Sequence, residues 1–301
     1  MSFGVNFSEA TDEQQLICNK LAAAAFGEPL SETDFLEREE FMSRQALAQD
    51  DGYASALLHN LAQWLDGPGD ALASMLYSNK EVFYARLGWT PVPAPAIVLP
   101  TDLSIDDDLY MAHGTQDNIR HLCADDIDEL CIEDTRTLLD IDKVRTAEGH
   151  TFMTVLPTTD LIDWQHKRAD FMAMKIHKKS PTVKGALHSS NAWIYWHHDF
   201  RKQRLFVQRI RISVEPGVER DDALVSLVLC AIREAQSWAL PTVVLWGVAS
   251  DLHNRFDILK TRFGRLDPIL QTQRRETTSI RWRGGKNDKA DIIPDEHYAW
   301  N

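Results

Sequence analysis

One predicted strand constrains the fold more than any other feature of this 301-residue chain. It lies at residues 242–248, where the sequence TVVLWGV carries no charged side chain. A strand without polar alternation is buried on both faces of a sheet, as parallel strands covered by helices are. Helical patterns flank it, because apolar residues recur at the 3.6-residue period over 221–238 and a second helix is predicted over 251–263. The sequence therefore predicts a sheet with helices packed on it.

Further strands precede this unit. Three are predicted over 183–188, 192–198 and 204–214, and residues 199–202 (DFRK) are typical of a turn that joins the last two into a hairpin. Before them come a helix that begins near Asp125, a strand over 151–156 and a helix capped by Thr158 or Thr159. This order predicts an α+β fold for residues 122–301, with a mixed sheet flanked by helices.

The first hundred residues are predicted to be mainly helical. Helices are expected over 8–25, 31–48 and from residue 53 to about 65, followed by a strand at 73–77 and a helix at 79–87 that Gly88 ends. Residues 89–99 alternate prolines with apolar residues, so we expect extended chain or at most an edge strand there. Residues 101–121 are acidic and rich in turn residues, and they are interpreted as a linker between domains at 1–100 and 122–301.

The charge is divided unequally along the chain. Residues 1–150 hold 28 acidic and 9 basic residues, whereas residues 151–301 hold 17 acidic and 23 basic ones. The acidic half is expected to attract a cationic substrate or partner, to face the basic half, or simply to be solvated. Some of the basic residues at 273–275 and 281–286 are candidates to pair with it. Repulsion from phosphates argues against nucleic acid as a partner.

Other classes of site and location are also disfavoured. No apolar run reaches the roughly 20 residues of a membrane-spanning helix, and the acidic start of the chain is unlike a secretory signal, so we expect no membrane partner and a cytoplasmic location, with the nucleus as the other possibility. The four cysteines form no CxxC pair, and His197 and His198 point to opposite faces of one strand. We therefore expect no metal site.

Several motifs carry a family resemblance. They are LYSNKEVFYARLGW at 76–89, WIYWHHDFRK at 193–202, IRW at 280–282 and DEHYAW at 295–300. In this order they resemble GNAT-type acyl-CoA N-acyltransferases, and in particular the fungal lysine N6-acetyltransferase family. The resemblance covers most of the chain and implies two GNAT-like domains in tandem, with acetyl-CoA as the acyl donor and no metal.

The chain departs from that family at one place. In the family, strands and a glycine-rich RGxGYA loop precede the helix that begins here at Tyr53, but only residues 47–52 separate Ala46 from Tyr53. The first domain is thus predicted to be truncated, by a deletion or by an error in the gene model. Backbone N–H groups at a helix N-terminus hold pyrophosphate, so Gly52, Tyr53 and Ala54 are the remaining candidates for cofactor binding. The two aspartates before Gly52 would repel it.

The resemblance assigns one catalytic residue. Tyr84 occupies the place of the tyrosine that protonates the departing CoA thiolate, and packing of its ring with the hydroxyl hydrogen-bonded is the alternative interpretation. Tyr77, on the preceding strand, is a candidate to line the acyl-binding cleft, against simple packing in the core or at an edge.

Two functions remain open. The first is an acetyl-CoA-dependent N-acetyltransferase acting on lysine or a similar small cationic amine. The second is a catalytically inactive or misspliced member of the family that acts only as a binding or structural module. Without the central strands, the strand at 73–77 is predicted to form an unpaired edge, which favours self-association unless the second domain or another chain covers it.

Overall fold

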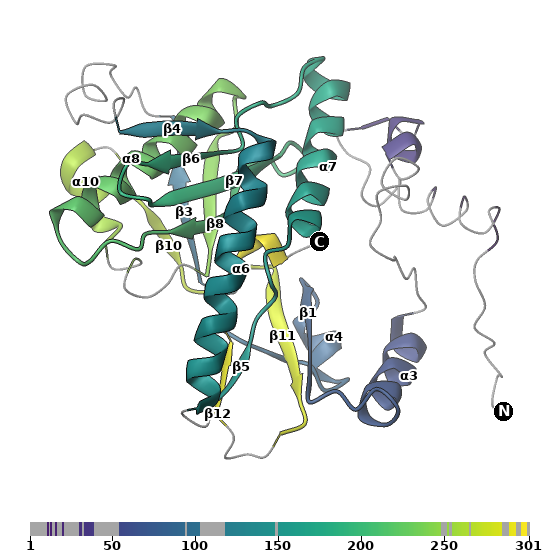
Figure 1. The fold of residues 1–301 in the computed structure, drawn as a ribbon. Coiled ribbons are helices and arrows are strands. Elements are labelled where there is room, and N and C mark those ends of the chain that lie inside the picture. Colours follow the sequence, from purple (N-terminus) through teal and green to yellow (C-terminus); the bar gives the residue numbers. More distant parts are fainter. Residues whose placement is uncertain are drawn as a thin grey trace.

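A computed structural model gives the fold (Figure 1). It describes residues 11, 13, 16, 20, 30–31, 33–38, 54–93, 95–102, 118–147, 150–247, 252, 255–264, 266–284, 289–292 and 296–299. Within these ranges, no helix is long and apolar enough to cross a lipid bilayer. The predicted residues Gly52 and Tyr53 lie outside the described ranges.

A seven-stranded sheet forms the centre of the molecule. Its order is β10 (Ile269–Gln271), β3 (Ala96–Pro100), β9 (Thr242–Trp246), β8 (Arg204–Arg211), β7 (Trp193–Asp199), β6 (Gly185–His188) and β4 (Ile119–Leu122). All neighbours are antiparallel except β8 and β9, which are parallel. The predicted α+β fold with a mixed sheet is therefore confirmed, as is the hairpin that joins β7 to β8.

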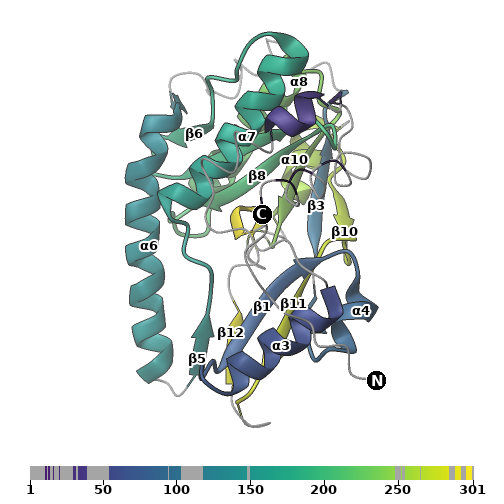
Figure 2. The same cartoon turned by 90° about the vertical axis from the view of Figure 1, so that its right-hand side faces the viewer.

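Helices cover both faces of this sheet (Figure 2). Along β7 the side chains alternate between two cores. Trp193 and Tyr195 join a cluster with residues of α6 (Ala124–Ala147), whereas Ile194 and Trp196 join the larger cluster formed with α8 (Val218–Ser237). Helix α7 (Thr159–His177) contributes residues to both clusters. The short helix α10 (Asp257–Phe263) packs at α8.

A smaller sheet lies below the large one in Figure 1. It contains β1 (Ala73–Ser78), β11 (Thr277–Trp282) and β2 (Thr90–Pro91), in that order, and α3 (Ala54–Asp66) and α4 (Glu81–Ala85) belong to the same part of the chain. A parallel pair is formed by β5 (His150–Met153) and β12 (Lys289–Ile292). The chain then reaches the 3₁₀ turn η1 (His297–Ala299), which packs between the large sheet and α7.

The two sheets exchange strands. β3 comes from the first hundred residues but lies inside the seven-stranded sheet, between β10 and β9. β11 comes from near the C-terminus but lies between β1 and β2, and it pairs with β1 from Ala73↔Trp282 to Ser78↔Thr277. The C-terminal part thus covers one side of β1. The other side has no strand partner among the described residues, and self-association through it stays a prediction.

Candidate active site

Tyr84 lies on the short helix α4, which follows β1 and packs beside β11 and β2. The backbone N–H of Lys80 donates to Ser78 Oγ (2.9 Å) where the strand ends. The helix ends at Ala85 and a turn follows to Gly88, whose φ of +99° favours glycine. The buried Trp89 then donates from Nε1 to Ser74 Oγ on β1 (3.0 Å). The helix therefore has a fixed position relative to the strand before it.

The ring of Tyr84 is half-buried. It packs edge-to-face on Phe83, with the ring centroids 5.1 Å apart. Its main-chain oxygen accepts hydrogen bonds from the N–H groups of Leu87 and Trp89, both at 3.0 Å. A half-buried phenol on a fixed helix is compatible with proton donation, and the catalytic role of Tyr84 remains a prediction.

Tyr77 lies on β1 and faces the C-terminal part of the chain. In the β1–β11 ladder it is opposite Thr278. Its half-buried ring packs against the cluster of buried residues that includes Tyr195 from β7 and Tyr298 from η1. Tyr77 is thus part of the contact between the small sheet and the core of the large one, whether or not it also lines a cleft.

The start of α3 is the predicted cofactor site. Ala54 is the first residue of this helix, and no acidic residue occupies the first turn. The N-terminal N–H groups of a helix attract phosphate, and a first turn without carboxylates is compatible with that use. The two other candidates, Gly52 and Tyr53, immediately precede Ala54 outside the described residues, so cofactor binding here stays a prediction.

Arginines of the β11 region pair with the acidic N-terminal part. Both terminal nitrogens of Arg281 donate to the carboxylate of Asp66 at the end of α3, one of them at 2.5 Å. This hydrogen bonding lowers the pKa of Asp66 and raises that of Arg281. Arg283 donates to the carbonyl oxygen of Leu65 (2.9 Å), and Thr277 donates to Glu81 of α4. The predicted pairing of these basic residues with the acidic half is confirmed.

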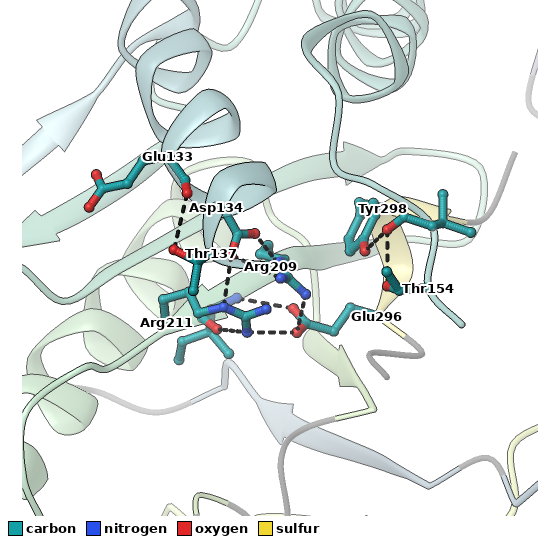
Figure 3. Close-up of polar contacts among 10 residues, drawn as sticks. Glu133, Asp134, Thr137, Thr154, Arg209, Arg211, Glu296 and Tyr298 are labelled. Carbon is teal, nitrogen blue, oxygen red and sulfur yellow. Dashed lines mark hydrogen bonds and ion pairs between the residues drawn. The ribbon is translucent and has the colours of Figure 1, made fainter. Parts of the chain in front are cut away.

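A buried charge network joins the C-terminus to the large sheet (Figure 3). It consists of Asp134 from α6, Arg209 and Arg211 from β8, and Glu296 just before η1. Arg209 has no exposed surface and donates to both carboxylates, at 2.9 Å to Asp134 Oδ1 and 2.9 Å to Glu296 Oε1. Arg211 donates to the same two oxygens at 3.0 and 3.1 Å. The network ties three distant segments together.

Burial sets the protonation behaviour of this network. The pKa of Glu296 is raised to about 7. Burial is the main cause and the nearby Asp134 adds to it, while the attraction of Arg209 opposes both. Burial likewise raises the pKa of Asp134, with Arg209 lowering it. The Arg209 guanidinium stays charged, because the attraction of Glu296, Tyr298 and Asp134 exceeds the effect of burial and raises its pKa.

The histidines of this region are buried and neutral. His166 contacts Gln208 Oε1 (2.8 Å) and the carbonyl of Trp196 (3.0 Å), and burial lowers its pKa to about 3. The rings of His197 and His297 lie in tilted contact on one side of β7, with centroids 4.8 Å apart, while His198 contacts Glu234 of α8 on the other side (2.9 Å). The described residues contain no group of three or more His, Cys, Asp or Glu side chains that could hold a metal ion.

The sequence offered one signal for the charge network that its interpretation missed. Asp134 falls on the apolar stripe of its helix, together with Ile127, Cys131 and Leu138, all of them buried. An aspartate at such a position requires a buried cationic partner. Its partners lie 75 to 77 residues further along the chain, on β8, so the pairing itself could not be inferred from local pattern.

Comparison with known proteins identifies relatives. The family model described as the LYC1 GNAT-like C-terminal domain matches residues 107–301. No curated protein sequence matches the chain. Among solved structures, a GCN5-related N-acetyltransferase from Kribbella flavida has 14% identity and a TM-score of 0.39, covering 76% of this chain and 47% of that one.

Two other solved structures are similar in the same degree. A conserved protein of unknown function from Enterococcus faecalis V583, described as a probable N-acyltransferase, has 14% identity and a TM-score of 0.44, covering 78% of this chain and 51% of that one. Eis1 from Mycobacterium abscessus has 14% identity and a TM-score of 0.39, covering 78% and 53%. The chain thus spans about half the length of these proteins.

Proposed function

Since the chain belongs to the family of the LYC1 GNAT-like C-terminal domain, we propose that it is an N-acetyltransferase that uses acetyl-CoA as its acyl donor. The acceptor that its charge fits is the amine of lysine or a similar small cation. The excess of acidic residues in the first half of the chain supports this choice, because an acidic surface concentrates cations near it.

The reaction forms a C–N bond and breaks a C–S bond. The amine nitrogen attacks the thioester carbonyl, the C–S bond of the resulting intermediate breaks, and the CoA thiolate leaves. Tyr84 donates its phenolic proton to that thiolate, the attacking nitrogen loses its extra proton to water, and the Tyr84 phenolate then takes a proton back from water. The observation that carries the proposal is the attachment of the chain at both ends of α4, where Lys80 is hydrogen-bonded to Ser78 and Trp89 to Ser74 of β1. General acid catalysis of this kind contributes about 10²- to 10⁴-fold in rate.

Backbone groups are expected to hold the donor. A CoA pyrophosphate would be bound by the N–H groups at the start of α3, including those of Gly52, Tyr53 and Ala54, and the absence of acidic residues from the first turn of that helix is compatible with this role. Tyr77 would line the cleft that binds the acyl group.

A second function is favoured by a specific observation. The family match covers residues 107–301 and begins after every residue proposed for catalysis or cofactor binding. Two aspartates, Asp50 and Asp51, stand where the family resemblance places a glycine-rich loop. In this second function the chain is a non-catalytic member that serves as a binding or structural module.

The test separates the two functions. Calorimetric titration with acetyl-CoA is expected to give heat with a dissociation constant below a millimolar concentration, and thiol release is expected with lysine as acceptor. Tyr84→Phe should lower kcat by about 10²-fold or more with little change in KM. Val82→Thr is the control, because Val82 is 67% exposed on the same helix. No heat and no thermal shift at millimolar acetyl-CoA would leave only the non-catalytic function.

A further inference from the structure

The last described part of the chain is attached to both sheets. At one end β11 pairs with β1 and β2. After β12 the chain returns to the large sheet, where Glu296 accepts hydrogen bonds from Arg209, Arg211 and the backbone N–H of Ile210 (3.2 Å). We call residues 277–299 the C-terminal arm. Its two ends are fixed on different sheets.

Polar contacts around Glu296 fix the turn that follows it. The amide of Gln165 on α7 donates to the carbonyl oxygens of His297 (3.4 Å) and Tyr298 (3.2 Å). The hydroxyl of Tyr298 donates to the carbonyl oxygen of Val155 (Figure 3). The guanidinium of Arg209 lies 5.1 Å from the centre of the Tyr298 ring. The orientation of this ring therefore depends on the charge network that Glu296 completes.

The same ring belongs to the surface on which Tyr77 packs. Tyr298 and Ala299 are members of the buried cluster that the half-buried Tyr77 contacts from the small sheet. Glu296 directly precedes η1, residues of η1 belong to the buried cluster, and Tyr77 packs on that cluster. Glu296 and Tyr77 thus adjoin the same buried cluster, one at η1 and the other from β1.

We propose that Glu296 is a positioning residue for the Tyr77 side of the active site, acting through the η1 turn and Tyr298. The inference rests on the proposed function only in so far as Tyr77 lines the acyl-binding cleft. The structural link from Glu296 to β1 can be tested without activity.

The alternative is a purely structural network. A buried carboxylate paired with two arginines can stabilise the large sheet without any particular effect on β1. The two roles differ in where the protein opens when the carboxylate charge is removed. A positioning role predicts opening at η1 and β1, whereas a structural role predicts opening throughout the large sheet or at β8.

Hydrogen exchange measured on the full chain distinguishes these outcomes. In Glu296→Gln, peptides covering 296–299 and β1 are expected to exchange about tenfold faster, while β9 and α8 keep their protection. Glu234→Gln is the control, because Glu234 is a largely buried carboxylate of α8 (13% exposed) that forms hydrogen bonds with His198 of β7 and Trp238. It should leave β1 unchanged.

A milder variant covers the case in which Glu296→Gln fails to fold. Arg211 is 27% exposed, so Arg211→Lys keeps the charge and weakens the pairing with Glu296. A smaller increase in exchange is expected at the same two peptides. The inference is overturned if a folded variant leaves β1 at wild-type protection, or if exchange rises equally in β1, β8 and β9.

Steady-state kinetics provide the second measurement. Glu296→Gln should raise the KM for acetyl-CoA about fivefold and leave kcat within about twofold, because Tyr84 is unaffected. A loss of kcat with unchanged KM would contradict the positioning role. Wild-type protein without turnover would instead refute the proposed function, and the exchange experiment would still decide whether Glu296 positions β1.

Discussion

The large and small sheets are stabilised by different depths of core. In the seven-stranded sheet every residue of β7 is buried, and α8 packs a long apolar face on the strands beside it. In the three-stranded sheet, β1 is half-buried at all positions except Ser78, and α4 has no buried residue. Since buried apolar area supplies most of the folding free energy, the large sheet is expected to be the stable part.

The polar contacts of the two sheets differ in the same way. The charge network of the large sheet is removed from solvent, while the ion pair between Arg281 and Asp66 leaves 19% and 41% of the two side chains exposed. Tyr84, proposed for catalysis, and Tyr77, proposed for the acyl-binding cleft, lie in the part with the shallow core. Their geometry is therefore supported mainly by the C-terminal arm, through β11 and through the cluster at η1.

The largest difference between the two parts is expected on loss of Arg209. Arg209→Met leaves Asp134 and Glu296 buried without their main partner, and removal of one member of a buried ion pair costs about 3–5 kcal/mol. Urea unfolding of the full chain, followed by tryptophan fluorescence, would give the change in unfolding free energy.

A surface pair provides the control for this variant. Lys260→Met removes the partner of Asp267, where the side chains are 58% and 65% exposed, and should not change the urea midpoint measurably. If Arg209→Met were as stable as Lys260→Met, the charge network would contribute nothing to the large sheet, and the contrast drawn between buried and exposed pairs would be wrong.

The pattern of the sequence was sufficient for the central strands of the large sheet but not for β3 and β4 or for the exchange of strands. β9 and the β7–β8 hairpin were predicted because uncharged runs and turn residues are local signals. β3 was expected to be an edge strand at most, yet β9 and β10 pair with its two sides. Its prolines explain the error: Pro95 precedes the strand and Pro100 ends it, so Ala96–Leu99 can donate hydrogen bonds freely.

The same limit applies to the candidate site. The motif around Tyr84 is contiguous and could be recognised, but β11 reaches β1 from about 200 residues further along the chain, and no local period encodes such pairing. The partners of Asp134 lie 75 to 77 residues away, which is also beyond any local period. The sequence therefore supplied a hypothesis for the catalytic residue, which stays a prediction, and the structure was needed to find the segments that pack around it.

Matched leucine variants test the difference in core depth directly. Leu245 on β9 is 1% exposed, so Leu245→Ala should lower the unfolding free energy by about 2–5 kcal/mol. Leu76 on β1 is half-buried, and Leu76→Ala should cost about 1 kcal/mol. Equal losses in urea unfolding would show that the small sheet is as well packed as the large one.

Acid should weaken the large sheet through four of its buried histidines, His166, His197, His198 and His297. Burial lowers the pKa of each, so the unfolded chain binds more protons than the folded one below the ordinary pKa of about 6.5. Stability contributed by each neutral histidine is complete above pH 6.5 and falls as the pH drops, by up to about 1.4 kcal/mol per unit for each group. Glu296 has the opposite effect, because its pKa is raised in the folded chain. Between about pH 4.5 and 7 the folded chain binds more protons at this residue, so a lower pH increases stability there.

Urea unfolding at pH 7.5 and 5.5 measures the balance of these groups. Four histidines outweigh one glutamate, so the unfolding free energy should be lower at pH 5.5. His166→Gln removes one of the four and should reduce the difference between the two pH values by about 1 kcal/mol. A protein that is more stable at pH 5.5 would mean that the histidines are not held neutral.

The smallest effect on overall stability is expected at the contact between β11 and α3. Arg281→Glu places two carboxylates together at the end of α3, where Asp66 now accepts both guanidinium hydrogen bonds. Because the pair is partly exposed, the melting temperature should fall by only a few degrees, but hydrogen exchange in α3 and β1 should become faster. Arg281→Glu combined with Asp66→Arg restores the opposite charges and should restore protection in both elements. If the double variant exchanges no more slowly than Arg281→Glu alone, the pair does not hold α3 on β11, and the small sheet depends on its β-ladder alone.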